Sequence, residues 1–95
     1  MNEVDTMNSK QILSMNLKYY RKMLGLSQEK FAEVIGSNLV YLNQIENCRR
    51  KPTIDMLDKI SNNLNLYNPK LNITSALLLT YDKSHKTNFT RIDQR

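Results

Sequence analysis

The sequence has few residues that break helices and few that cross-link or bind metal. Its 95 residues include two Gly, two Pro, one Cys, one His and no Trp. One Cys cannot build a disulfide framework, and one Cys with one His is too few for structural zinc, which takes four such ligands. No apolar run is longer than four residues, far below the ~20 of a membrane span. We therefore expect a small, soluble domain without metal or cofactor.

The N-terminus carries Glu3 and Asp5 and no apolar stretch, which argues against a secretory signal and favours a cytoplasmic protein. The chain is basic, with 14 Lys plus Arg against 9 Asp plus Glu and a net charge of +5. Residues 10–24 hold four positive and no negative side chains, and residues 49–51 hold three more, whereas residues 25–47 have one Lys against three Glu. Positive charge around a nearly neutral stretch is typical of proteins that bind a phosphate backbone while neutral side chains read sequence.

Apolar spacing and the few breakers predict five helices. Leu13, Leu17, Tyr20 and Leu24 recur at steps of four, three and four, which is one helical stripe, and Gly25 follows it as a stop. The later helices are expected to begin at residues that cap helices or fit their first turn: Ser27, Ser37 or Asn38, Thr53, and Pro69 behind Asn68. The fourth helix is expected to end near Asn65, and the fifth to carry Leu71 and residues 76–78.

The predicted organisation is one domain between two tails. Residues 1–9 are expected to be a flexible arm, residues 10–81 the helical domain, and residues 82–95 a C-terminal tail and possible dimerisation element. Alternation in residues 88–92 hints at a short strand. His85 stands in a polar stretch without a second metal ligand, so we expect it to have no functional role.

Residues 28–46 have the pattern of a helix-turn-helix unit: two short helices joined by Gly36-Ser37-Asn38. Ala32 is small where the two helices cross, and Gly36 can take the positive φ that the turn needs. Apolar residues stand where the helices pack on each other and on the first helix: Phe31, Ile35, Leu42 and Ile45. Together these matches are far more specific than any one of them.

The amino-acid sequence of this region resembles the lambda-repressor-like (Cro-type, or XRE) family of helix-turn-helix DNA-binding regulators. The landmarks are Leu-Ser-Gln at 26–28, the small Ala32, the turn Gly36, Ile-Glu-Asn at 45–47 and Lys-Pro at 51–52. The resemblance covers roughly residues 16–66. It implies an all-α bundle of four or five helices whose third helix docks in the DNA major groove. It also implies that Arg21 pairs with Glu46 and ties the first helix to the end of the third.

The resemblance and the positions of the side chains together suggest DNA contacts. Residues at the start and on one face of the third helix are expected to read bases: Asn38, Leu39, Val40 and Gln44. Gln44 suits a two-point contact with adenine, and Leu39 and Val40 suit thymine methyl groups, which favours an A·T-rich site. Phosphate contacts are expected from polar and basic residues: Gln28, Tyr41, Asn43, Asn47, Arg49, Arg50 and Lys51. An alternative for Leu39 is a partly buried position at the start of the helix.

Two further features bear on the loop after the third helix and on assembly. Relatives usually have Gly, in a left-handed conformation, where this chain has Cys48. Three consecutive leucines on a helix cannot all face one way, so part of the set Leu77, Leu78, Leu79 and Tyr81 is expected to meet a second subunit, although these side chains could also simply complete the monomer core.

The sequence thus predicts a cytoplasmic, all-α, non-enzymatic transcriptional regulator, a repressor that binds a palindromic operator in double-stranded DNA as a homodimer and takes no small-molecule ligand. Two alternatives stay open. One is an antitoxin of the same fold, with a toxin-binding surface in its tail. The other is a protein-assembly module that has lost DNA binding, which the apolar pair Leu39-Val40 would suit.

Overall fold

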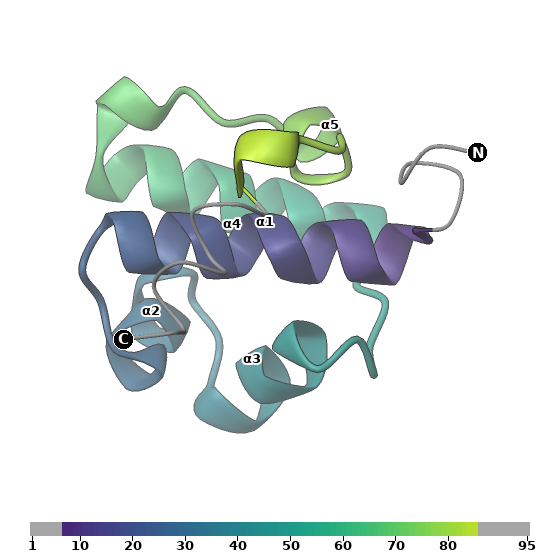
Figure 1. Ribbon diagram of the computed structural model, residues 1–95. Helices are drawn as coiled ribbons and strands as arrows, with labels where there is room; N and C mark the ends of the chain where they lie inside the picture. Colours follow the sequence, from purple (N-terminus) through teal and green to yellow (C-terminus); the bar gives the residue numbers. More distant parts are fainter. Residues whose placement is uncertain (1–6, 86–95) are drawn as a thin grey trace.

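The computed structural model describes residues 7–85, and within that range it is all-α, with no strand. Its elements are α1 (Ser9–Met23), α2 (Gln28–Val34), α3 (Leu39–Glu46), α4 (Ile54–Tyr67), the 3-10 turn η2 (Pro69–Leu71) and α5 (Ser75–Leu78). Figure 1 shows α1 crossing the middle of the molecule, with α2 and α3 below it and α4 and α5 above. The strand predicted within residues 88–92 lies outside the described residues.

The capping residues expected from the sequence begin α2, α3 and α4. The side chains of Ser27, Asn38 and Thr53 each accept a hydrogen bond from the backbone N–H three residues later, which satisfies one of the unpaired donors at a helix start. Asn8 forms a capping box with Gln11, and α1 begins at Ser9, which is the last residue of the arm expected from the sequence.

The core lies where α1 meets the helix-turn-helix unit on one side and α4 with α5 on the other. Its fully buried apolar side chains come from all five α-helices: Leu17, Phe31, Ile35, Leu42, Ile45, Ile60, Leu64 and Leu78. Each such side chain removed from water contributes about 1.5–3 kcal/mol. The short helices α2 and α3 therefore hold their shape through tertiary burial, because isolated helices of their length are unstable.

Leu78, one of the side chains expected to meet a second subunit, is buried within the monomer. Its side chain is 0% exposed and belongs to the core cluster, so it completes the monomer and is not available to a second subunit. Leu77 and Leu79 are 46% and 36% exposed, and Tyr81 is half-buried. The three leucines do point in different directions, as helical geometry requires.

The region after α4 also differs from the prediction. Asn65 does not end α4, which continues to Tyr67. Its side chain instead clamps Ile73, donating from Nδ2 to the carbonyl of Ile73 and accepting the N–H of Ile73, both at 2.8 Å. The expected fifth helix is split into η2 and α5, because Asn72 adopts a left-handed conformation with φ 49° and Thr74 caps a new helix start.

His85, for which the sequence predicts no functional role, packs on α1 and has a structural role there. Oδ1 of Asn16, a fully buried residue of α1, accepts a hydrogen bond from Nδ1 of His85 at 2.8 Å. The Asn16 Nδ2 group donates to the carbonyls of Leu78 at 2.8 Å and Thr80 at 3.0 Å. The imidazole stacks on Tyr19 with ring centroids 3.8 Å apart. The side chain of Asn16 thus holds residues 78–85 against α1 through hydrogen bonds.

Cys48 adopts a left-handed conformation with φ 61°, so this chain keeps at position 48 the backbone geometry that the resemblance implies for glycine. Its N–H donates to the carbonyl of Ile45 at 3.0 Å, and the N–H of Arg49 donates to the carbonyl of Gln44 at 2.8 Å. These two bonds end α3 in the way that a glycine after a helix usually does.

Replacing Cys48 by Gly is expected to leave the protein equally stable or to stabilise it by up to about 1 kcal/mol, because glycine takes this conformation without the penalty of a Cβ atom. Thermal unfolding followed by circular dichroism measures the effect, with Cys48→Ala as the matched control that keeps a Cβ. A clear fall in melting temperature for Cys48→Gly, but not for Cys48→Ala, would contradict this explanation of the loop.

Candidate nucleic-acid interface

The backbone of the turn between α2 and α3 packs closely against two side chains of α4. Gly36 has φ +78°, and a Cβ atom there would lie 2.7 Å from Nδ2 of Asn63 and 2.9 Å from Cε of Lys59. That same Asn63 Nδ2 donates to the carbonyl of Ile35 at 2.9 Å. Glycine at this position therefore satisfies both the positive φ and the contact with α4. Buried Ala32 lies one turn earlier, and the two short helices have a fixed crossing.

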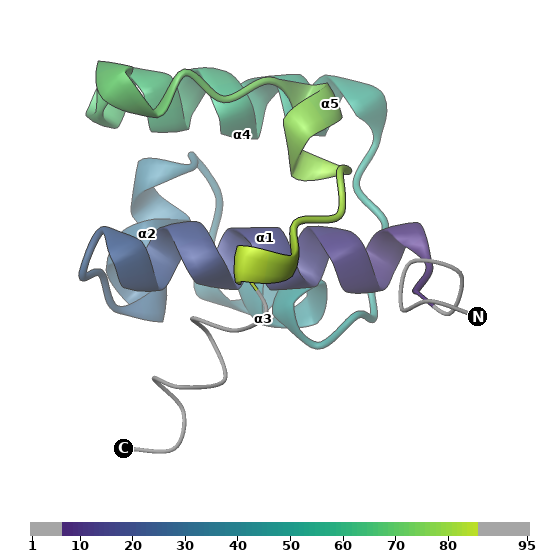
Figure 2. The same cartoon turned by 45° about the horizontal axis from the view of Figure 1, so that its top comes forward.

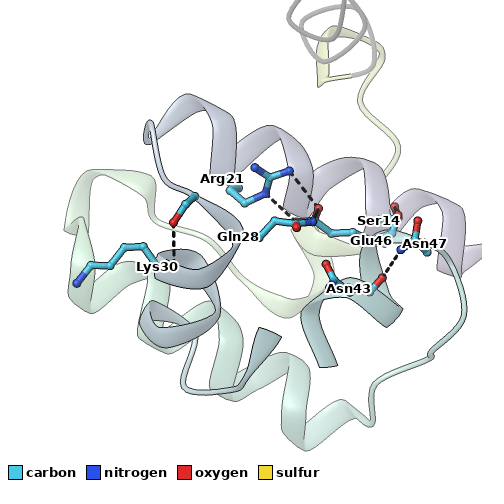
Figure 3. A network of polar contacts seen from close by, with 8 residues as sticks. Ser14, Arg21, Gln28, Lys30, Asn43, Glu46 and Asn47 are labelled. Carbon is cyan, nitrogen blue, oxygen red and sulfur yellow. Dashed lines mark hydrogen bonds and ion pairs between the residues drawn. The ribbon is translucent and has the colours of Figure 1, made fainter. Parts of the chain in front are cut away.

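The far end of α3 is anchored by a buried carboxylate, shown in Figure 3. Arg21 of α1 faces Glu46 with two hydrogen bonds, from Nε to Oε2 at 2.9 Å and from Nη2 to Oε1 at 3.1 Å. Gln28 Nε2 donates to the same carboxylate at 2.9 Å. Ser14 Oγ donates to the backbone carbonyl of Glu46 at 2.6 Å. Side chains from α1 and α2 thus fix the orientation of α3.

Gln28 therefore has a different role in the free protein from the phosphate contact expected of it. Its amide is half-buried and directed at Glu46. Its backbone lies at the first position of α2, whose N-terminus has Glu29 in the first turn and Ser27 as its cap. Backbone N–H groups at such an end remain suited to a phosphate through the helix dipole.

The outer face of α3 is neutral and partly apolar. Val40 is 67% exposed, whereas Leu39, at the helix start, is 38% exposed and so is partly covered by its neighbours. Asn38 is exposed, but its side-chain oxygen accepts the N–H of Tyr41 at 2.9 Å. Its amide N–H groups are the part left for a ligand. Gln44 lies further along the helix and is half-buried.

A small cluster joins α3 to the loop that follows it. Arg50 Nε donates to Oε1 of Gln44 at 2.6 Å, and the guanidinium carbon of Arg50 lies 4.8 Å from the centroid of the Tyr41 ring. Burial raises the pKa of Tyr41 above its usual 10.0, and Arg50 lowers it by less. The Tyr41 hydroxyl is thus protonated at neutral pH and can donate a hydrogen bond to phosphate.

The remaining predicted phosphate contacts lie beside this cluster. Arg49, Arg50 and Lys51 are exposed in the loop before α4. Asn47 is exposed and donates from Nδ2 to the carbonyl of Asn43 at 2.8 Å, at the end of α3 (Figure 3). The structure therefore groups α3 and the basic loop on one side. In both views α5 lies on the opposite side of α1 from α3 (Figures 1 and 2).

The sequence does not predict the roles of two side chains, Ser14 and Asn16, or one contact, that of Arg50 with Gln44. A polar residue at a position buried among apolar neighbours, as Ser14 and Asn16 are between Leu13 and Leu17, was the available signal for the first two. No sequence spacing signals the third contact, because it depends on the left-handed turn at Cys48.

Comparisons with known proteins agree with this geometry. A helix-turn-helix family model matches residues 17–70, more than half of the chain. The chain belongs to the XRE-type, lambda-repressor-like helix-turn-helix family. It is 37% identical over 65 residues to the control protein C.SmaI of Serratia marcescens, an alignment that covers 68% of this chain and 77% of that protein. The protein is accordingly a DNA-binding regulator.

The fold is also similar to a solved structure, that of the hypothetical transcription factor NHTF from Neisseria. The TM-score is 0.66, the sequences are 20% identical, and the match covers 84% of each chain. At that identity the likeness speaks for the fold alone. None of the helices within residues 7–85 is both long and apolar enough to cross a membrane. Within the same range, no three His, Cys, Asp or Glu side chains gather as metal ligands would.

Proposed function

We propose that this protein is a sequence-specific transcriptional repressor that acts in the cytoplasm, without enzymatic activity, and binds a palindromic operator as a homodimer. The observation that carries the proposal is the placement of α3. Its ends are fixed by the Asn38 cap and the Glu46 network, and Leu39 and Val40 project from it beside a loop of three cations. The name of the Serratia marcescens relative, control protein, supports a regulatory role.

In this proposal, one set of residues provides affinity for DNA and another set provides sequence specificity. Arg49, Arg50 and Lys51 neutralise phosphates, which contributes affinity that falls with salt and depends little on sequence. Asn38, Leu39, Val40 and Gln44 meet base edges in the major groove, which contributes specificity. Tyr41 and the amides of Asn43 and Asn47 position the helix on the backbone, together with the start of α2 at Gln28.

The proposed dimer uses the exposed leucines on the side of α1 away from α3. Leu77 in α5 is 46% exposed and Leu79, the residue that caps the end of α5, is 36% exposed. Half-buried Tyr81 follows them. A twofold dimer would place two copies of α3 about 34 Å apart, one turn of DNA, so that each reads one half-site.

Two substitutions test the division of labour. Arg49→Ala is expected to weaken binding to every duplex alike and to reduce the salt slope of log K by about one, because it removes one phosphate contact. Gln44→Ala is expected to cost roughly 1–3 kcal/mol on the preferred site and to relax preference at one base pair. Fluorescence anisotropy on the preferred duplex and on a scrambled one, at several salt concentrations, measures both.

The two variants serve as controls for each other, since both change exposed or half-buried polar side chains near the same helix. Equal losses for Arg49→Ala and Gln44→Ala on preferred and scrambled DNA would refute the division of labour. Binding that does not depend on salt, or no binding to any duplex at low ionic strength, would refute the proposed function as a whole.

A further inference from the structure

Arg50 is placed against Gln44 by the way α3 ends. The left-handed residue Cys48 turns the chain back, with the N–H of Arg49 bonded to the Gln44 carbonyl at 2.8 Å. Arg50, the next residue, then reaches over α3, where its Nε donates to Oε1 of Gln44 at 2.6 Å. The guanidinium carbon of Arg50 also lies over the Tyr41 ring, 4.8 Å from the ring centroid. Both contacts fix the same side chain.

The chemistry of the pair settles which way the Gln44 amide faces. A guanidinium has N–H donors and no acceptor. The group of Gln44 that faces Arg50 must therefore be the oxygen, and the amide cannot be turned around without losing a charge-assisted hydrogen bond. The Nε2 group, with its two N–H donors, is the part of the side chain left for a ligand.

This orientation changes what Gln44 is suited to read. A two-point contact with adenine needs both ends of the amide, with Oε1 accepting from N6 and Nε2 donating to N7. Guanine presents two acceptors in the major groove, N7 and O6. An amide whose oxygen is held by Arg50 matches the acceptors of guanine, whereas a released amide matches adenine.

We propose that Arg50 is a positioning residue that determines base specificity through Gln44: by holding Oε1 it makes Gln44 a donor-only reader that prefers guanine. The Nη groups of Arg50 stay available for a phosphate, so the same side chain links backbone contact to base reading. This inference rests on the proposed function, since it requires α3 to face base edges. It replaces adenine, which the sequence suggests for an unrestrained Gln44, with guanine.

The test is selection from a random duplex pool with four proteins: the natural chain, Gln44→Ala, Arg50→Met and Arg49→Met. Arg50→Met keeps an unbranched side chain but removes the hydrogen-bond donor to Gln44. Arg49→Met makes the same change of charge at the neighbouring residue, which bonds to Gln44 through its backbone N–H and not through its side chain. Gln44→Ala identifies the base pair that Gln44 reads. Each preference is then measured by anisotropy on duplexes that differ only at that base pair.

We expect the natural chain and Arg49→Met to prefer guanine over adenine at that position by about tenfold or more. Arg50→Met is expected to shift the preference to adenine or to abolish it there, with the other positions of the site unchanged. The inference is overturned if the natural chain prefers adenine or thymine at that position, or if Arg50→Met keeps the natural preference. If Gln44→Ala selects the same sequence as the natural chain, Gln44 reads no base and the inference is overturned as well. If the natural chain selects no sequence, the proposed function itself fails.

Discussion

Replacing Glu46 by Ala is expected to lower the free energy of unfolding by about 3 kcal/mol, the largest single-residue effect among the polar side chains of the site. The Glu46 side chain is 4% exposed and that of Arg21 is 13% exposed. Without the carboxylate, the buried guanidinium keeps its charge but loses two hydrogen-bond acceptors, and Gln28 loses its partner as well. Urea unfolding followed by circular dichroism measures the loss.

A double-mutant cycle separates the pair from the packing around it. Arg21→Met alone strands the carboxylate, and the double variant Arg21→Met with Glu46→Ala removes both charges. The double variant is expected to be less destabilised than the sum of the two single variants, because no unpaired charge remains buried. Glu46→Ala within 1 kcal/mol of the natural chain, or strict additivity in the cycle, would show that the pair does not anchor α3.

Replacing Asn16 by Ala is expected to destabilise the protein by about 2–3 kcal/mol, because the buried carbonyl of Leu78 loses its side-chain donor and the hydrogen bonds to neighbouring carbonyls and to His85 are lost as well. The Asn16 amide is 0% exposed and donates to the carbonyls of Leu77, Leu78 and Thr80. Thermal unfolding measures the loss. The exposed Asn62 gives a control of the same chemistry on α4, and Asn62→Ala is expected to stay within 0.5 kcal/mol. Equal effects at the two positions would contradict the assignment.

Lowering the pH is expected to reduce the stability of the protein, because it protonates His85, which contacts Asn16. Burial lowers the pKa of His85 below its ordinary 6.5, against an opposing effect of Asp82. The stability contributed by neutral His85 is therefore fully present above pH 6.5 and is lost as pH falls from there through the folded-state pKa. The rings of Tyr19 and Tyr20 also face the imidazole, and burial raises the pKa of Tyr20 above its usual 10.0. Asn16→Ala, which removes one partner of the imidazole, is expected to weaken the dependence.

The sequence predicts the helix-turn-helix unit well because its constraints are local. Ser27 and Asn38 each cap a helix through a side-chain oxygen that reaches only three residues along the chain. Gly36 is needed for a turn whose φ is positive. Such requirements are visible in the residue types themselves, and the family resemblance then supplies the partners of Arg21 and the direction in which α3 faces.

The parts that the sequence did not predict depend on contacts between distant segments. Asn65 suits a helix end, but here it stays helical because its amide clamps Ile73 eight residues later. His85 is polar and near the C-terminus, yet it is buried against Asn16, 69 residues earlier. Leu78 and Leu77 are identical in type, and only the packing of α5 on α1 and α4 decides that the first is buried.

The central claim is that α3 and the basic loop form the surface that meets duplex DNA. The most direct measurement is the set of backbone amide NMR shifts of the isotope-labelled full chain, recorded at low salt as a duplex is added. We expect the largest shifts within residues 38–51 and at the start of α2, with little change in Ser75–Leu78. Large shifts confined to α5, or no shift anywhere at duplex excess, would contradict the claim.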